Sequence, residues 1–279
     1  MKQIFRPTAA LARMAVLALS ALPLSALPLS AQSVDDMLRV QLLSGWQTPE
    51  GHRMAALDLK LAQGWKTYWR APGEAGIPPV FDWTGSENLA GVTLHWPSPE
   101  VIDLNGLRSI GYHERLVLPM EVTARDASKP VTLQLKMDLG LCKDICLPAS
   151  VTLHGRLEGA GGPDRTIRDA LAARPLSAAE AGLTGISCSI VPIEDGLRLT
   201  ASLNLPRFGT GEEVVVFEAS DQTIWVSQAQ SARHGGAVIA STDMVATSGA
   251  PFALDRQGVI VTVLADKKSV ELQGCPAPG

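Results

Sequence analysis

Short stretches in which apolar and polar residues alternate recur along this chain, and they constrain its fold more than any other feature. A period of two is typical of a β-strand with one buried face. Such stretches cover 54–61, 92–96, 116–122, 131–137, 149–155, 196–203, 213–218, 238–240 and 258–264. Glycine (25) and proline (19) are plentiful, as in proteins whose short strands are joined by turns. The pattern predicts an all-β fold.

One region interrupts the strands and divides them into two sets. Residues 159–163 read Gly-Ala-Gly-Gly-Pro, and the Ala/Arg-rich stretch 164–174 suits a short helix that Asp164 caps and Pro175 closes. A second short helix is predicted over 177–181. The length of the chain suits two β-sandwiches joined by this short, partly helical linker. The predicted boundaries are 1–31 for a signal peptide, 32–158 for the first sandwich, 159–184 for the linker and 185–279 for the second sandwich.

The N-terminus has the features of a secretory signal peptide. Three positive residues precede the apolar run 14–22, and small residues follow up to Ala31, after which cleavage is expected. Leu29 at the −3 position is larger than usual. An uncleaved membrane anchor is the alternative, but the apolar run is short for a membrane span and is broken by Pro23 and Pro28. The sequence thus predicts export to the periplasm as a soluble mature protein.

The net charge of the protein disfavours two classes of partner. The chain carries a formal charge of −4, and removal of Lys2, Arg6 and Arg13 with the signal peptide changes it to −4 − 3, or −7. A negative protein is repelled by nucleic acid and by anionic membranes. Neither is expected as a partner.

Two of the four cysteines lie close together, in Leu141-Cys142-Lys143-Asp144-Ile145-Cys146-Leu147-Pro148. A turn between two strands brings Cys142 and Cys146 within the Cα separation that a disulfide needs. So short a loop gains little stability from cross-linking, which favours redox exchange over a structural bridge. Lys143 favours a thiolate and Asp144 opposes it, so their net effect is left open. A surface disulfide that stays oxidised is the alternative.

The other two cysteines, Cys188 and Cys275, stand at the two ends of the predicted second sandwich. A bridge between them closes a long loop, where cross-linking stabilises most. We predict a structural disulfide.

Residues from about 64 to 153 resemble the N-terminal periplasmic domain of the thiol:disulfide interchange protein DsbD, and still more closely the same region of its relative ScsB, the copper-sensitivity suppressor protein. The resemblance is carried by Gly-Trp-Lys-Thr-Tyr-Trp-Arg-Ala-Pro-Gly at 64–73, Gly-Ile-Pro-Pro at 76–79, His-Trp-Pro-Ser-Pro-Glu at 95–100, Ile-Gly-Tyr at 110–112, Leu-Val-Leu-Pro at 116–119 and the cysteine segment 141–148.

The resemblance implies an immunoglobulin-like β-sandwich that carries electrons as a protein-disulfide reductase of the thiol:disulfide interchange type. Cys142 and Cys146 match the exchanging pair, although their spacing is shorter than in DsbD. The loop 103–109 matches a cap over the active site, with Leu104 or Leu107 in place of an aromatic ring. Tyr68 and Tyr112 are candidates for the edge of the site, because a hydroxyl there could steer a thiolate.

The implied partners are periplasmic thioredoxin-like proteins. DsbD and ScsB continue into a membrane domain and a thioredoxin-like domain that this chain does not contain. The resemblance therefore implies a separate membrane electron donor.

Two other functions stay open. Cys142 and Cys146 as thiolates suit Cu(I) or Zn(II), with His113 and Met120 or Met137 as helpers, in a copper-tolerance protein. No cofactor or resident metal is otherwise expected, because the five histidines are scattered. The sandwich could also be an interaction module with a purely structural disulfide. The sequence lacks Gly-x-Ser-x-Gly, which leaves nucleophilic hydrolysis without support.

Overall fold

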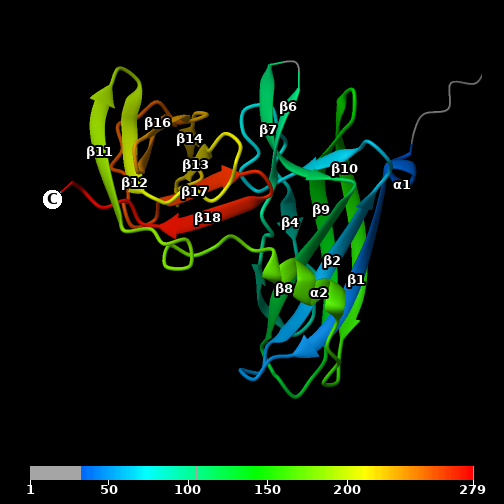
Figure 1. Ribbon diagram of the computed structural model, residues 1–279. Coiled ribbons are helices and arrows are strands. Elements are labelled where there is room, and N and C mark those ends of the chain that lie inside the picture. The colour runs from blue at the N-terminus through cyan, green and yellow to red at the C-terminus, as the bar shows by residue number, and fades with distance from the viewer. Residues whose placement is uncertain (1–32, 105, 279) are drawn as a thin grey trace, which may run out of the picture. The chain divides into compact units, whose positions relative to one another are not determined.

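The computed structural model describes residues 33–104 and 106–278, apart from the side chain of Leu104 (Figure 1). The predicted signal peptide, 1–31, lies outside the described residues. Every pairing between the named strands is antiparallel. No helix in the described part is long and apolar enough to cross a membrane.

Residues 38–157 form two sheets. The first has the order β1-β2-β8-β5, with β1 (Leu38–Gln47), β2 (Arg53–Leu61), β8 (Arg115–Ala124) and β5 (Leu89–Leu94). The second has the order β10-β9-β3-β7-β6, with β10 (Cys146–Leu157), β9 (Val131–Cys142), β3 (Lys66–Tyr68), β7 (Leu107–His113) and β6 (Glu100–Leu104). A short strand, β4 (Val80–Asp82), also pairs with β9. Leu57 of β2, Leu118 of β8 and Leu135 of β9 share one core, so the two sheets face each other as a sandwich.

Residues 185–273 repeat this plan. One sheet has the order β11-β12-β16-β14, with β11 (Gly185–Ile193), β12 (Gly196–Asn204), β16 (Ala237–Ala246) and β14 (Ile224–Val226), and β15 (Gln230–His234) also pairs with β16. The other has the order β13-β17-β18, with β13 (Val214–Glu218), β17 (Ile260–Ala265) and β18 (Lys268–Gln273). Leu199 of β12 and Val261 of β17 belong to one buried cluster.

Strand β9 shows how the sequence pattern builds the first sandwich. Val131, Leu133, Leu135, Met137 and Leu139 are buried, and the residues between them are half-buried or exposed. This is the alternation of a strand with one face on the core. From Leu139 to Cys142 four successive residues are buried. The outer face of β9 is therefore covered at this end, and only at this end.

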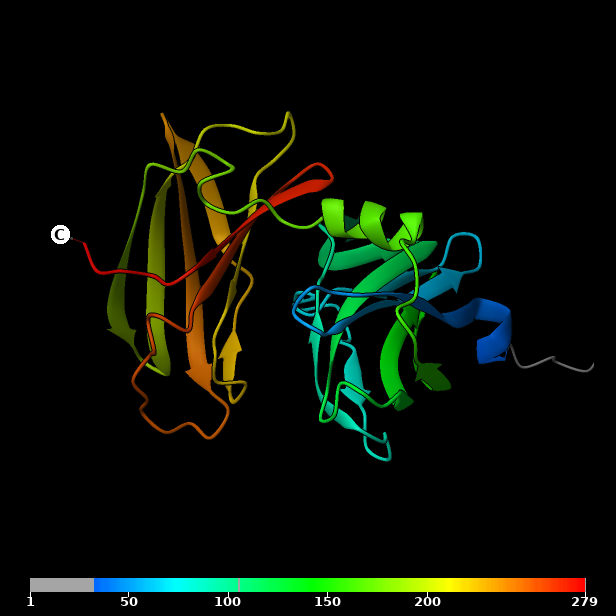
Figure 2. The same cartoon turned by 90° about the horizontal axis from the view of Figure 1, so that it is seen from below.

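Two short helices accompany the strands: α1 (Val34–Met37) and α2 (Arg165–Ala172). The Asp164 carboxylate caps α2 by accepting a hydrogen bond from the Ile167 backbone N–H at 3.1 Å. Ile167 is fully buried against Met54 and Ala56 of β2, so α2 lies on the outer face of the first sheet beside β8 (Figures 1 and 2).

The prediction of an all-β fold built from immunoglobulin-like sandwiches is confirmed, and the helix capped by Asp164 is present. That helix ends at Ala172, two residues earlier than predicted, because the residue before Pro175 is disfavoured in a helix. The helix predicted over 177–181 is wrong: this segment is a turn with one backbone hydrogen bond, from Ala181 N–H to the Ser177 carbonyl, and the Glu180 carboxylate accepts from the Ser177 N–H and hydroxyl. The domain boundaries at 158, 184 and 185 stay a prediction.

A disulfide joins Cys188 to Cys275, the pairing expected from the sequence. Cys188 lies on β11, Cys275 follows β18, and both are buried. The bridge thus ties the first strand of 185–273 to the segment that leaves its last strand.

We expect the double substitution Cys188→Ala, Cys275→Ala to lower the free energy of unfolding by about 4–5 kcal/mol in the chain-entropy model, because the 87-residue separation makes a long loop. Urea unfolding followed by circular dichroism measures this loss. As a matched control, Cys142→Ala, Cys146→Ala opens a loop of separation 4 and should cost about 2 kcal/mol or less. Equal losses from both pairs would contradict the assignment.

Candidate functional site

The sequence-predicted cysteine pair closes a hairpin. Cys142 is the last residue of β9, Cys146 is the first of β10, and the two are register partners across a three-residue loop, 143–145. Their Cα atoms are 4.2 Å apart and their sulfurs form a disulfide. The turn predicted between two strands is confirmed.

The two sulfurs have unequal access to solvent. Strand β9 lies between β10 and β3, whereas β10 is the last strand in its sheet order. Cys142 is therefore flanked on both sides and is 1% exposed, while Cys146 is exposed. Cys146 is thus the residue of the pair that a thiolate from solution can approach, while neighbouring strands flank Cys142 on both sides.

A buried tyrosine hydroxyl contacts both sulfurs. Tyr68 Oη lies 2.7 Å from Cys142 Sγ and 3.0 Å from Cys146 Sγ, and Tyr68 is 1% exposed. Disulfide sulfurs carry no proton, so the hydroxyl is the donor in this contact. Burial raises the pKa of Tyr68 above its usual value, which keeps the hydroxyl protonated at neutral pH. The hydroxyl is placed to stabilise negative charge on either sulfur.

Glycine at position 140 makes room for the tyrosine ring. A Cβ at Gly140 would lie 2.7 Å from a Tyr68 ring carbon and 2.8 Å from Ile77 Cβ. The Thr67 hydroxyl donates to the Gly140 carbonyl at 3.0 Å and ties β3 to β9 at the same level. The segment that connects β3 to β4 thus covers Gly140 and Tyr68, through Ile77 and through the Ala75 carbonyl 3.4 Å from the Tyr68 hydroxyl.

A buried lysine lies on the same face. Lys66 is paired in register with Cys142 on one side and with His113 on the other, and directly opposed residues of antiparallel strands project to the same face. Lys66 is 6% exposed, and its amine donates to Ser109 Oγ at 3.3 Å. Within the described residues no carboxylate forms an ion pair with this amine. Burial lowers the pKa of Lys66.

The residues predicted as a cap belong to a second hairpin, formed by β6 and β7. Leu104 pairs with Leu107 at its end. Leu107 is 64% exposed, and the Leu104 side chain lies outside the described part. The structure places Ile77 and Ala75 over the tyrosine, and the capping role of the two leucines stays a prediction.

Tyr112 lies on the other face of its sheet from Tyr68. It is 6% exposed, its ring stacks on Trp96 at 6.3 Å, and its hydroxyl donates to the Pro97 carbonyl at 2.8 Å. These contacts place Tyr112 in the core of the sandwich, and its role at the edge of the site stays a prediction.

The residues considered for copper are not gathered around the cysteines. Met120 and Met137 are buried in the core at 0% and 1% exposure, and His113 Nδ1 faces the Glu100 carboxylate at 3.3 Å. In the described chain no group of three or more His, Cys, Asp or Glu residues is arranged to hold a metal ion.

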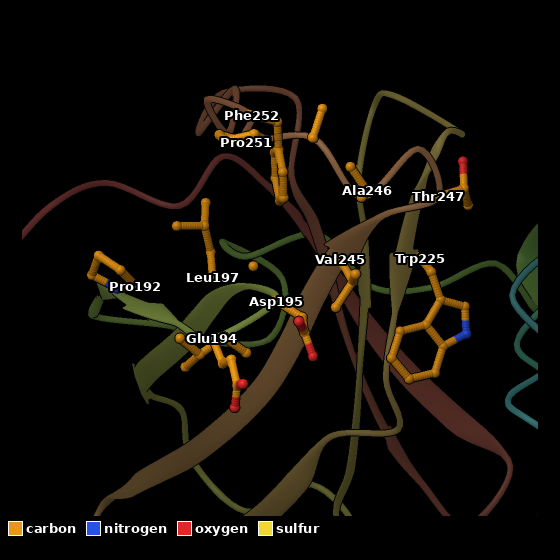
Figure 3. Close-up of a pocket in the computed structure, with 14 residues that line it drawn as sticks. Pro192, Glu194, Asp195, Leu197, Trp225, Val245, Ala246, Thr247, Pro251 and Phe252 are labelled. Atoms are coloured by element: carbon orange, nitrogen blue, oxygen red, sulfur yellow. The ribbon is translucent and has the colours of Figure 1, made fainter.

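A pocket of about 730 Å³ lies elsewhere, among strands of 185–273 (Figure 3). The Trp225 indole forms one side of it, Phe252 and Pro251 come from the loop after β16, and the Glu194 and Asp195 carboxylates come from the β11–β12 turn (Figure 3). No cysteine lines it.

Sequence reasoning singled out Tyr68 but missed Lys66, Ile77 and Gly140. The position of Lys66 could have been predicted from the alternation of core-facing and outward-facing residues along its strand. Trp65 and Trp69 belong to the core of the sandwich, and Thr67 is the register partner of Leu141, which lies in the same core. The residues between them therefore project to the opposite face, the one that holds the cysteines.

Comparison with known proteins identifies the first sandwich. The family model described as "Thiol:disulfide interchange protein DsbD, N-terminal" matches residues 39–156. No curated protein sequence matches the chain. Among solved structures, the N-terminal periplasmic domain of ScsB from Proteus mirabilis matches with a TM-score of 0.66 and 23% identity, over 89% of this chain and 97% of that one. At this identity the likeness shows the fold alone.

The family match contains both cysteines of the hairpin disulfide, Tyr68, whose hydroxyl contacts both sulfurs, and Lys66, the register partner of Cys142. Residues 39–156, which hold the hairpin site, are thus similar to the N-terminal domain of the thiol:disulfide interchange protein DsbD.

Proposed function

We propose that this protein exchanges disulfides through Cys142 and Cys146 and passes electrons to or from thioredoxin-like partners in the periplasm. One observation carries the proposal: the hairpin disulfide joins an exposed residue, Cys146, to a buried one, Cys142, and a buried tyrosine hydroxyl contacts both sulfurs. A purely structural bridge needs neither the difference in exposure nor the hydroxyl.

The exchange begins at the exposed sulfur. A partner thiolate attacks Cys146 Sγ, a bond forms between the two sulfurs, and the Cys142–Cys146 bond breaks with its electron pair on Cys142 Sγ. A second partner thiol then attacks the partner's own sulfur in this mixed disulfide and releases Cys146. The partner leaves as a disulfide and the hairpin holds two thiols. The reverse sequence passes the electrons onward.

Tyr68 acts on the leaving group. Its hydroxyl is 2.7 Å from Cys142 Sγ, where negative charge develops as the disulfide breaks. A hydrogen bond to a charged acceptor is roughly twice as strong as one between neutral groups. The bond therefore stabilises the thiolate more than the disulfide and lowers the barrier to attack at Cys146.

Further observations support the periplasmic location of the protein and the docking of a partner beside Cys146. The predicted signal peptide and the periplasmic origin stated for the matching ScsB domain support a periplasmic site of action. Ile145 precedes Cys146 and is 66% exposed, so a partner that docks there covers an apolar side chain beside the reactive sulfur. A membrane protein domain would supply the electrons.

The order of attack is testable with two matched variants. Cys142→Ser leaves the exposed thiol, and Cys146→Ser leaves the buried one, while both lose the same disulfide. We expect the Cys142→Ser protein to react with 5,5′-dithiobis(2-nitrobenzoic acid) on the order of tenfold faster or more, because reactivity follows exposure and thiolate character. Equal rates, or a faster Cys146→Ser protein, would show that the exposed sulfur is not the point of entry.

Removal of the tyrosine hydroxyl tests its action on the leaving thiolate. We expect Tyr68→Phe to slow reduction of the hairpin disulfide by dithiothreitol about tenfold, since a hydrogen bond to a charged group contributes about 1.5–3 kcal/mol. Tyr112→Phe is the matched control, because that hydroxyl binds Pro97 in the core and its loss should leave the rate unchanged. Equal rates for Tyr68→Phe and the unsubstituted protein would remove Tyr68 from the mechanism.

A further inference from the structure

Lys66 is a buried amine that the proposed exchange does not yet use. It is 6% exposed, and in the described structure its hydrogen-bond partner is the neutral Ser109 hydroxyl, which in turn lies 3.4 Å from the Ile102 carbonyl. A buried ammonium without a carboxylate is costly, because burial removes its hydration. A fold can retain a buried lysine of this kind when another redox state of the protein places a negative charge beside it.

The reduced hairpin supplies that charge next to Lys66. Cys142 is the register partner of Lys66 on the neighbouring strand, and Cβ atoms of directly opposed residues are about 4.5–5.5 Å apart. Both residues are buried, so water screens their interaction poorly. A Cys142 thiolate would be a buried anion on the face of the sheet that holds Lys66.

Other charged groups around the pair are exposed or already partnered. The titratable and charged groups on neighbouring elements are His113, Glu100, Tyr68, Lys143 and Asp144. His113 and Glu100 face each other at 3.3 Å. Lys143 and Asp144 in the hairpin loop are exposed. Tyr68 donates a hydrogen bond but carries no charge at neutral pH. Lys66 is thus the buried cation of the site.

We infer that Lys66 is a positioning residue for the proposed exchange: its ammonium stabilises the Cys142 thiolate and so favours the reduced form of the Cys142–Cys146 pair. The inference rests on the proposed function. The Lys66 ammonium has no negative charge beside it when the pair is a disulfide, and it has one when Cys142 is a thiolate. It therefore destabilises the oxidised form and stabilises the reduced form.

The test compares Lys66→Met, Lys66→Arg and Lys136→Met in the full mature protein. For Lys66→Met we expect the equilibrium constant for reduction by dithiothreitol to fall about tenfold, the size of a Coulomb interaction across about 10 Å at an effective dielectric constant of about 20. For a two-electron couple this is about 30 mV toward more negative potential. We also expect the pH midpoint for alkylation of Cys142 to move upward.

The controls separate charge from packing. Lys66→Arg keeps the charge and should retain the wild-type constant, and Lys136→Met removes an exposed lysine of β9 that lies outside the site and should change little. The oxidised Lys66→Met protein should be at least as resistant to urea as the wild type, because a buried uncompensated charge is removed.

Each failure has its own signature. If Lys66→Met has the wild-type equilibrium constant and the wild-type alkylation midpoint, or if its oxidised form is clearly less stable to urea, the inference is overturned while the proposed function stands. A wild-type pair that stays oxidised below about −300 mV overturns the proposed function and, with it, this inference.

Discussion

The chemistry of this protein depends on the pairing of β9 with β10 on one side and β3 on the other. Because β9 is an interior strand and β10 ends the sheet order, a disulfide across the end of their hairpin has one flanked sulfur and one open sulfur. The same pairing sets Lys66 of β3 opposite Cys142 and brings the Tyr68 hydroxyl to the Cys142 sulfur. In the proposed function, the reactivity of the pair and the stabilisation of its leaving group are consequences of this strand order.

The site departs from the rule that the outer face of a half-buried sheet is solvated. At the Cys142 end of β9 both faces are buried, and the outer face holds a tyrosine hydroxyl, a lysine amine and two sulfurs instead of apolar side chains. Polar groups in such a place lower stability unless they are partnered. Their presence is easier to explain by a charge that forms there during the reaction than by a contribution to folding.

Much of the scaffold could be predicted from the sequence, because the period of two in segments such as 131–137 reports directly on which face is buried. The Cys142–Cys146 turn and the involvement of Tyr68 could also be recognised. Other features depend on non-local pairing. That Lys66 lies opposite Cys142 requires the register between β3 and β9, and that Ile77 covers Gly140 requires the path of a connecting segment. The short turn at 177–181 was mistaken for a helix because alanine-rich local propensity says nothing about tertiary context.

The central claim is that the Cys142–Cys146 pair is poised for exchange while Cys188–Cys275 is structural. The most direct measurement is the reduction potential of each pair in the purified mature protein, obtained by titration with glutathione and dithiothreitol and by trapping of free thiols. The account predicts a potential between about −180 and −280 mV for Cys142–Cys146, the range of known exchange proteins, with Cys188–Cys275 still oxidised there. A Cys142–Cys146 pair that resists reduction to well below about −300 mV would contradict it.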